Sequence, residues 1–464
     1  MPEFVHTSRL PASAQDAFDW HARPGAFDRL VPPWERIELL ERGEGIGPGS
    51  RTVLKTFVGP FWRRWVALHQ ESGAPLAFRD VQTQGPFASW DHLHTMRPLA
   101  AGSDAPPCEY EDRVQYALPF AALSHRVAGG WVRGQLERTF AYRHRVVARD
   151  LARHASTPPV ATMKIAVTGA SGLVGSSLVP FLTTGGHEVV RLVRRAPQGA
   201  DEVQWDPKSG LTDPSKLEGV DAVVHLAGDN IAKGRWTREK KERIEKSRTE
   251  GTRNLAAALA KLEHKPKAFV TASAIGFYGA DRGDEALDDH STPGDDFLAN
   301  VCREWEAAAQ PARDAGIRVV NLRLGIVLSP KDGALAKMLT PFKLGAGGKV
   351  GSGKQWMSWV SIDDVVGGFH HALVTDSLEG PVNLVAPNPV QNQGFTTALG
   401  RVLNRPTLFP LPGFVVKTIF GEMGEALLLG SQRVQPTRLL ESGFKFDEPE
   451  LEGALRHLLG KRGS

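Results

Sequence analysis

The chain has 464 residues, which is too long for a single compact core, so two or three domains are expected. Its formal net charge is only +4 and its basic residues are interleaved with acidic ones, which disfavours nucleic-acid binding. It has two distant cysteines, Cys108 and Cys302, and no apolar run of membrane-spanning length, so we expect a cytoplasmic protein without disulfides.

Residues 1–155 are expected to form an α+β domain. A strand ends at Pro11, two short helices run up to Pro32–Pro33, four strand-like stretches follow, and a long amphipathic helix from about Ala121 to Arg153 closes the segment. This order of elements resembles the helix-grip fold of START-like (SRPBCC or polyketide-cyclase-like) proteins. The resemblance implies a cavity for a hydrophobic ligand between the sheet and the long helix.

Two sets of side chains in this segment have alternative interpretations. His92 and His94 alternate on one strand face and could be metal ligands, but no carboxylate or third ligand is spaced with them. We therefore interpret them as partly exposed strand histidines and predict no metal site. Trp62, Trp65 and Trp90 are candidates for the cavity wall or rim, or else they fill a solid core.

The chain changes character after residues 156–162, a polar segment with two adjacent prolines that we interpret as a linker. From Met163 strands alternate with helices, which predicts a doubly wound, mostly parallel α/β sheet. We expect a Rossmann domain over residues 163–400 that includes part of a substrate cleft, and a C-terminal helical cap over residues 401–464. The glycine-rich residues 344–356 are either a flexible lid over the cleft or an anchored surface loop.

A glycine-rich turn between the first strand and the first helix of this domain predicts a dinucleotide site. Gly169, Gly172 and Gly175 have the spacing G-x-x-G-x-x-G. The first glycine permits a tight turn, the second lets the backbone approach a pyrophosphate, and the third lets helix and strand pack closely. The phosphates would then lie at the helix N-terminus, where free N–H groups favour an anion.

The end of the second strand indicates which cofactor binds. A site for NAD places a carboxylate there for the ribose 2′-hydroxyl, whereas this chain has Arg194 and Arg195. Two guanidinium groups suit a 2′-phosphate, so NADP(H) is the predicted cofactor.

The chain resembles extended short-chain dehydrogenases/reductases in the segments VVHLAG (223–228), VTASAIGFYG (270–279) and NLRLGIVL (321–328). Further segments, which continue nearly to the C-terminus, resemble the atypical, epimerase-like subgroup of that superfamily, whose function is largely unknown. That subgroup is sometimes fused behind a START-like domain. The resemblance implies cofactor contacts from the following residues: Gly169, Ser171, Gly172, Leu173, Val174, Arg194, Arg195, Leu226, Ala227, Gly228, Arg248 and Val327. Without the resemblance, Arg248 could equally be a surface base.

The proton-transfer pair of this superfamily, Tyr-x-x-x-Lys, is absent. Phe297 and Val301 occupy the matching places, and the only tyrosine after the linker is Tyr278. Ser273 and Tyr278 remain as catalytic candidates. Cys302 and Glu306 are interpreted as a packing group and a surface group.

Two functions are compatible with these features. The first is an NADP-dependent, epimerase-like oxidoreductase acting on an unknown small molecule. The second is a non-catalytic NADP(H)-binding sensor or carrier fused to a hydrophobic-ligand domain. A cyclase or hydrolase activity of the N-terminal domain is a weaker third interpretation.

Overall fold

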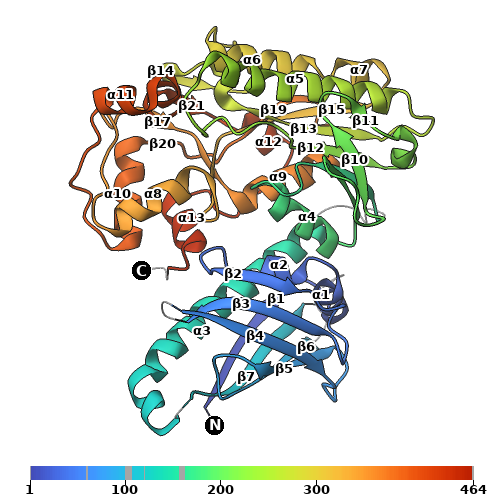
Figure 1. Cartoon of the computed structure of the whole chain (residues 1–464), viewed down its shortest axis with the longest axis vertical. Helices are drawn as coiled ribbons and strands as arrows, with labels where there is room; N and C mark the ends of the chain where they lie inside the picture. The colour runs from blue at the N-terminus through green and yellow to red at the C-terminus, as the bar shows by residue number, and fades with distance from the viewer. Residues whose placement is uncertain (1, 59–60, 100–106, 120, 156–161, 462–464) are drawn as a thin grey trace.

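The structure is a computed structural model that describes residues 2–58, 61–99, 107–119, 121–155 and 162–461. The predicted linker at residues 156–162 falls almost wholly outside the described residues. Two units lie end to end along the longest axis of the molecule, an N-terminal unit with an antiparallel sheet and a larger α/β unit (Figure 1).

The N-terminal unit is a seven-stranded sheet in the order β1-β7-β6-β5-β4-β3-β2, with every neighbouring pair antiparallel. Its strands are β1 (Glu3–Leu10), β2 (Ile37–Glu41), β3 (Arg51–Val58), β4 (Phe61–Gln70), β5 (Ala77–Gln84), β6 (Ser89–Pro98) and β7 (Cys108–Ala117). Its helices are α1 (Ala14–Ala22), α2 (Ala26–Leu30) and α3 (Ala121–Ala155). The predicted order of elements is thus present.

The sheet and α3 enclose a core with two apolar ends and a polar middle. Cys108 and Tyr110 belong to the apolar cluster at one end, and Trp90 and Val114 belong to the cluster at the other. Between them, His92 and His94 are only 3% and 6% exposed. The prediction of partly exposed histidines was wrong, because alternate residues of β6 all point into the core.

The three tryptophans considered for a ligand cavity have different surroundings. Trp90 is buried and packs with half-buried Trp65 in one apolar cluster. Trp62 is 40% exposed and its ring contacts the Phe57 ring at a tilt of 34°. A hydrophobic-ligand cavity in this unit stays a prediction.

The larger unit is built on an eight-stranded sheet in the order β11-β10-β9-β8-β12-β13-β15-β19, parallel except for β11. The strands are β8 (Lys164–Thr168), β9 (Glu188–Val193), β10 (Glu202–Asp206), β11 (Gly210–Leu211), β12 (Ala222–His225), β13 (Ala268–Ala274), β15 (Arg318–Leu324) and β19 (Gly380–Leu384). The strand order changes direction between β8 and β12, which is where ligands bind in open α/β sheets. The predicted doubly wound fold is confirmed.

Helices cover both faces of this sheet (Figure 1). They are α4 (Gly175–Thr184) and α9 (Ile362–Val374) on one face, and α5 (Arg238–Ala260), α6 (Phe297–Ala307) and α7 (Gln310–Asp314) on the other. Strand residues alternate between the two cores: Ile165 and Val167 pack with α4 and α9, whereas Ala166 packs with α5. No described helix is both long enough and apolar enough to cross a bilayer.

Short strands and helices extend the unit beyond the carboxyl ends of the main strands. The strands are β14 (Asp281–Leu287), β16 (Ile326–Leu328), β17 (Trp356–Met357), β18 (Trp359–Ser361), β20 (Val390–Gln391) and β21 (Ser431–Val434). The helices are α8 (Gly333–Lys343), α10 (Asn392–Leu403), α11 (Gly413–Gly424), α12 (Thr437–Glu441) and α13 (Leu451–Leu458). Residues of α8, α10 and α13 share one apolar cluster. Helices from the predicted Rossmann range (163–400) and from the predicted cap (401–464) therefore pack in a common core.

The glycine-rich loop at residues 344–356 is tied to its surroundings, which favours the anchored alternative over the lid. The Val350 amide donates to Asn392 Oδ1 (2.8 Å), and Gln355 Nε2 donates to the carbonyls of Val350 (3.0 Å) and Leu428 (3.1 Å). A side chain at Gly348 would meet the Phe409 carbonyl oxygen at 2.0 Å, so the loop packs backbone against backbone there.

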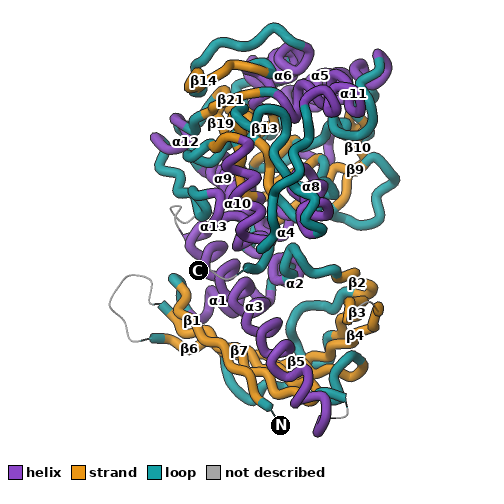
Figure 2. The backbone as a smooth tube through the Cα atoms, turned by 90° about the vertical axis from the view of Figure 1, so that its left-hand side faces the viewer, coloured by secondary structure: helices purple, strands orange, loops and turns teal. Residues whose placement is uncertain are grey.

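Largely buried ion pairs join the two units, with α2 and α3 lying against α4 (Figure 2). The pairs that cross the interface are Arg29–Asp363 (3.5 Å), Arg149–Glu448 (2.6 Å), Arg153–Asp364 (2.9 Å) and Arg153–Asp447 (2.6 Å). At Gly25 a side chain would lie 2.7 Å from the Cα atom of Pro180 on α4, so the backbones are in direct contact. The N-terminal unit is therefore packed onto the helix that follows the glycine-rich turn.

Candidate functional site

The glycine-rich turn follows β8 and leads into α4 as its spacing predicts. Gly169 has φ = 67°, a conformation that glycine adopts without strain. A Cβ atom on Gly169 would lie 3.0 Å from the Leu226 carbonyl carbon, and one on Gly175 would lie 2.3 Å from the Gly169 carbonyl oxygen. Gly172 is exposed on the outside of the turn, beside Ser171. The turn therefore needs glycine at 169 and 175 for packing, and leaves its outer face open.

A second loop follows β12 directly and lies beside the glycine-rich turn. The amides of Leu226 and Ala227 donate to Thr168 Oγ1 (3.0 and 3.2 Å), and the Thr168 hydroxyl also hydrogen-bonds His225 Nδ1 (2.8 Å). Thr168 thus fixes the loop after β12 to the end of β8, a role that the sequence did not single out.

Arg248 lies beside this loop and is not a solvated surface base. Its guanidinium carbon is 5.0 Å from the centre of the Trp305 ring, and a Cβ atom on Gly228 would be 3.2 Å from it. Burial lowers the pKa of Arg248. A partly buried cation beside the loop after β12 is well placed to meet an anionic ligand.

Leu173, Val174 and Val327 come together on the side of the turn that faces the C-terminal helices. All three pack on the apolar cluster shared by α8, α10 and α13. A Cβ atom on Gly333 would be 3.4 Å from Leu173 Cδ2 and 3.7 Å from the Val327 carbonyl oxygen. The first residues after the turn and β16 therefore lie next to each other.

The two arginines at the end of β9 have different surroundings. Arg195 makes a bidentate pair with Glu202 (2.6 and 2.7 Å), and its hydrogen bonds hold the pKa of Glu202 down to about 2. Arg194 is exposed and has no ion pair with any described residue. Of the predicted guanidinium pair, only Arg194 is available to an incoming phosphate without breaking an ion pair.

Ser273 and Tyr278 are linked by a buried ion pair. Ser273 Oγ donates to Glu306 Oε1 (2.7 Å), and Arg323 donates to both Glu306 oxygens (2.8 and 2.9 Å) and to the Tyr278 hydroxyl (3.0 Å). Glu306 is therefore an internal partner, and its interpretation as a surface group was wrong. It comes from α6 and reaches the end of β13 because one side of that helix packs on the sheet.

Tyr278 is enclosed in the protein. Its side chain is 0% exposed, and its hydroxyl lies 2.7 Å from Asn383 Oδ1 and 2.8 Å from the Asp288 carbonyl oxygen. Burial raises the pKa of Tyr278 to about 12. The hydroxyl stays protonated at neutral pH, and its hydrogen bonds are used within the protein.

The positions of the missing Tyr-x-x-x-Lys pair hold packing residues. Phe297 begins α6, where Lys241 Nζ lies 5.0 Å from the centre of its ring and Trp236 packs edge-on. Val301 is buried one turn later. Burial also raises the pKa of the Cys302 thiol to about 12, which agrees with its interpretation as a packing group.

The topology gathers these residues at one edge of the sheet. The turn at Gly169, the loop at Leu226 and Ser273 all stand at carboxyl ends of parallel strands, and β12 lies between β8 and β13. Two strand spacings separate the turn from Ser273, roughly 10 Å. A dinucleotide that binds its phosphates at the turn can extend across this distance toward Ser273.

Comparison with known proteins agrees with this geometry. The NAD dependent epimerase/dehydratase family matches residues 165–384, and a domain of unknown function (DUF1731) matches residues 411–458. An epimerase family protein of Mycobacterium tuberculosis is 42% identical over 304 residues, which are 66% of this chain and the whole of that protein.

Two solved structures are also similar. The crystal structure of the nucleoside-diphosphate sugar epimerase from Corynebacterium glutamicum is 34% identical with a TM-score of 0.79, over 98% of this chain and 90% of its own. Human epimerase family protein SDR39U1, solved with NADPH, is 37% identical with a TM-score of 0.59, over 64% of this chain and 99% of its own. The likeness to the first includes the N-terminal unit. The chain belongs to the NAD dependent epimerase/dehydratase family.

Proposed function

We propose that the chain is an NADP(H)-dependent, epimerase-like oxidoreductase that transfers hydride to or from an unknown small molecule. The observation that carries the proposal is the change of strand order between β8 and β12, where the glycine turn, Arg194 and Arg248 offer backbone N–H groups and two cations to a phosphorylated dinucleotide. The NADPH in the structure of the human relative supports the same cofactor here. When bound, the nicotinamide supplies the hydride chemistry.

The choice of NADP(H) over NAD(H) is tested at Arg194. Losing one hydrogen bond to a charged group reduces binding by roughly 1.5–3 kcal/mol, about tenfold or more. Arg194→Ala should therefore weaken NADPH binding at least tenfold in calorimetry and leave NADH binding unchanged. Arg195→Ala is the matched control with a smaller expected effect, because Arg195 is already held by Glu202. Equal affinity of the parent for NADPH and NADH would refute the assignment.

Proton transfer is assigned to Ser273 and not to a Tyr-Lys pair. Ser273 donates to Glu306, so the two can relay a proton: when a substrate hydroxyl gives its proton to Ser273, the serine passes its own proton to the Glu306 carboxylate, and the reverse direction returns it. Tyr278 and Arg323 then act as positioning residues that hold Glu306 in place.

Ser273→Ala should lower turnover by roughly 10²-fold once a substrate is known. Tyr278→Phe removes the hydrogen bonds of its hydroxyl to Asp288, Asn383 and Arg323, so it should lower the melting temperature more than it lowers turnover. A variant of Tyr278 with normal stability and a 10²-fold slower reaction would return the proton-transfer role to the tyrosine.

The alternative is a non-catalytic NADP(H)-binding sensor or carrier. The observations that favour it are the replacement of the Tyr-x-x-x-Lys pair by Phe297 and Val301 and the burial of both hydroxyl candidates, since Ser273 and Tyr278 are 2% and 0% exposed. Stoichiometric NADPH binding without turnover, across broad panels of carbonyl compounds and nucleotide sugars, would decide for this function.

We also propose that the N-terminal unit, residues 1–155, is a START-like domain that binds a hydrophobic ligand. The order strand, two helices, six strands and long helix supports this assignment. Native mass spectrometry of the purified full chain tests it, because a co-purified apolar molecule would be retained. A unit that holds no such molecule and takes up no apolar probe would contradict it.

A further inference from the structure

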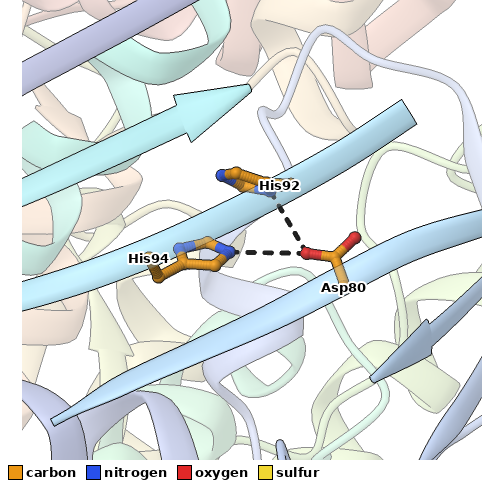
Figure 3. Close-up of side chains that lie close together, drawn as sticks. All are labelled: Asp80, His92 and His94. Carbon is orange, nitrogen blue, oxygen red and sulfur yellow. Dashed lines mark ion pairs between the residues drawn. The ribbon is translucent and has the colours of Figure 1, made fainter. Parts of the chain in front are cut away.

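Three potential metal ligands meet inside the N-terminal unit, on two neighbouring strands. Asp80 on β5 points between His92 and His94 on β6 (Figure 3). Asp80 Oδ2 is 3.2 Å from His92 Nδ1 and 3.6 Å from His94 Nε2, and the three ligand atoms all lie within 4.8 Å of one another. Two ligand atoms that each lie about 2.1 Å from a tetrahedral metal ion are roughly 3.4 Å apart. The distances from Asp80 Oδ2 to the two histidine nitrogens are already close to this value.

The opposite ring nitrogen of each histidine meets a second carboxylate. Asp112 Oδ1 on β7 lies 3.1 Å from His92 Nε2 and 2.6 Å from His94 Nδ1. Its other oxygen lies 2.8 Å from His144 Nε2 on α3, and the Asp112 side chain is fully buried. A carboxylate behind each imidazole is the usual arrangement around metal-bound histidine, since it fixes the ring and the tautomer. Each ring therefore has one nitrogen held by Asp112 and the other directed to Asp80.

We propose that Asp80, His92 and His94 bind a divalent first-row transition-metal ion, with Asp112 as the residue that orients both imidazoles. Two nitrogen ligands and one carboxylate oxygen suit such an ion better than Mg²⁺ or Ca²⁺, which prefer oxygen ligands. One divalent cation also balances the charges of the two buried carboxylates while both imidazoles stay neutral. Three protein ligands leave at least one position open for water or a ligand.

Of the three proposed ligands, Asp80 is the most exposed. The Asp80 side chain is 15% exposed, whereas the side chains of His92 and His94 are 4% and 7% exposed. His69 on β4 is the direct cross-strand partner of Asp80 in the antiparallel pair of β4 and β5, so another imidazole lies on the same face of the sheet as Asp80. The site lies between the two apolar clusters of the N-terminal unit and is distinct from the proposed dinucleotide site at the carboxyl ends of β8 and β12.

The test uses the full chain, stripped with a chelator and then dialysed against Zn²⁺ or Co²⁺. Mass spectrometry of the metal content should give one ion per chain in the parent, and less than a tenth of that in Asp80→Asn and in His92→Gln. Asp112→Asn should keep the ligands and weaken binding by about 10- to 100-fold. His371→Gln is the control, because it removes a half-buried histidine elsewhere that hydrogen-bonds Ser442.

Two results would overturn the proposal: a parent that binds no stoichiometric ion, or an unchanged metal content in Asp80→Asn. The circular dichroism spectrum and the urea unfolding midpoint of each variant show whether the N-terminal unit is still folded. If the variants do not fold, X-ray absorption of the zinc-loaded parent decides instead. Two imidazoles per zinc are expected, and a shell of oxygen ligands alone would contradict the assignment.

Discussion

Gly175→Ala is expected to weaken NADPH binding by more than 100-fold. The new Cβ atom would lie 2.3 Å from the Gly169 carbonyl oxygen and 2.7 Å from the Cα atom of Ala170, and neither backbone atom can rotate away. The turn and the start of α4 must therefore separate, which moves the N–H groups from the pyrophosphate position. Losing two hydrogen bonds to a charged group amounts to roughly 3–6 kcal/mol, or at least 100-fold in affinity.

Calorimetric titration of NADPH measures this effect directly. Gly47→Ala is the control, since a Cβ atom there has no neighbour within 4 Å and the residue lies in the N-terminal unit. We expect the control to bind NADPH like the parent. If Gly175→Ala bound NADPH within threefold of the parent, the cofactor would not bind on this turn.

Arg29→Ala should be the most destabilising single change at the interface between the two units. Arg29 pairs with Asp150 (2.6 Å) and reaches Asp363 (3.5 Å), and all three side chains are at most 9% exposed. Removing one member of a buried pair leaves an uncompensated charge, which typically destabilises by about 3–5 kcal/mol. Burial raises the pKa of Asp150 even with Arg29 present, so the loss should shrink as the pH falls and this carboxylate is protonated.

Urea unfolding at two pH values tests this expectation. Arg42→Ala is the matched control, because Arg42 pairs with Asp28 in the same unit but is 52% exposed. An exposed pair contributes about 0–1 kcal/mol, so the control should unfold near the parent midpoint. Equal midpoints for Arg29→Ala and Arg42→Ala would show that the buried pairs do not hold the units together.

The fold was predictable from the sequence where local pattern determines structure. A Cβ atom would lie 3.0 Å from backbone at Gly169 and 2.3 Å from backbone at Gly175, so both positions favour glycine, and their spacing identified the turn between strand and helix. The long helix α3 and the strand–helix alternation after Met163 follow from periodicity that packing did not override.

The site was less predictable where residues meet only in three dimensions. Glu306 and Arg323 are 17 positions apart on a helix and a strand, and nothing in their local sequence shows that they form a buried pair. His92 and His94 were visible as a pair, but Asp80 and Asp112 come from the strands on either side, so the cross-strand register was needed to find them. Arg195 likewise looked available for a phosphate until its contact with Glu202 was known.

The central claim is that one NADP(H) molecule binds at the carboxyl ends of β8 and β12. Native mass spectrometry of the full chain titrated with NADPH tests it most directly. We predict a single adduct of one NADPH per chain, which forms at a lower nucleotide concentration than the corresponding NADH adduct. The NADPH adduct should be lost in Gly175→Ala. A chain that forms no NADPH adduct, or forms it equally well when Gly175 is replaced, would contradict this account.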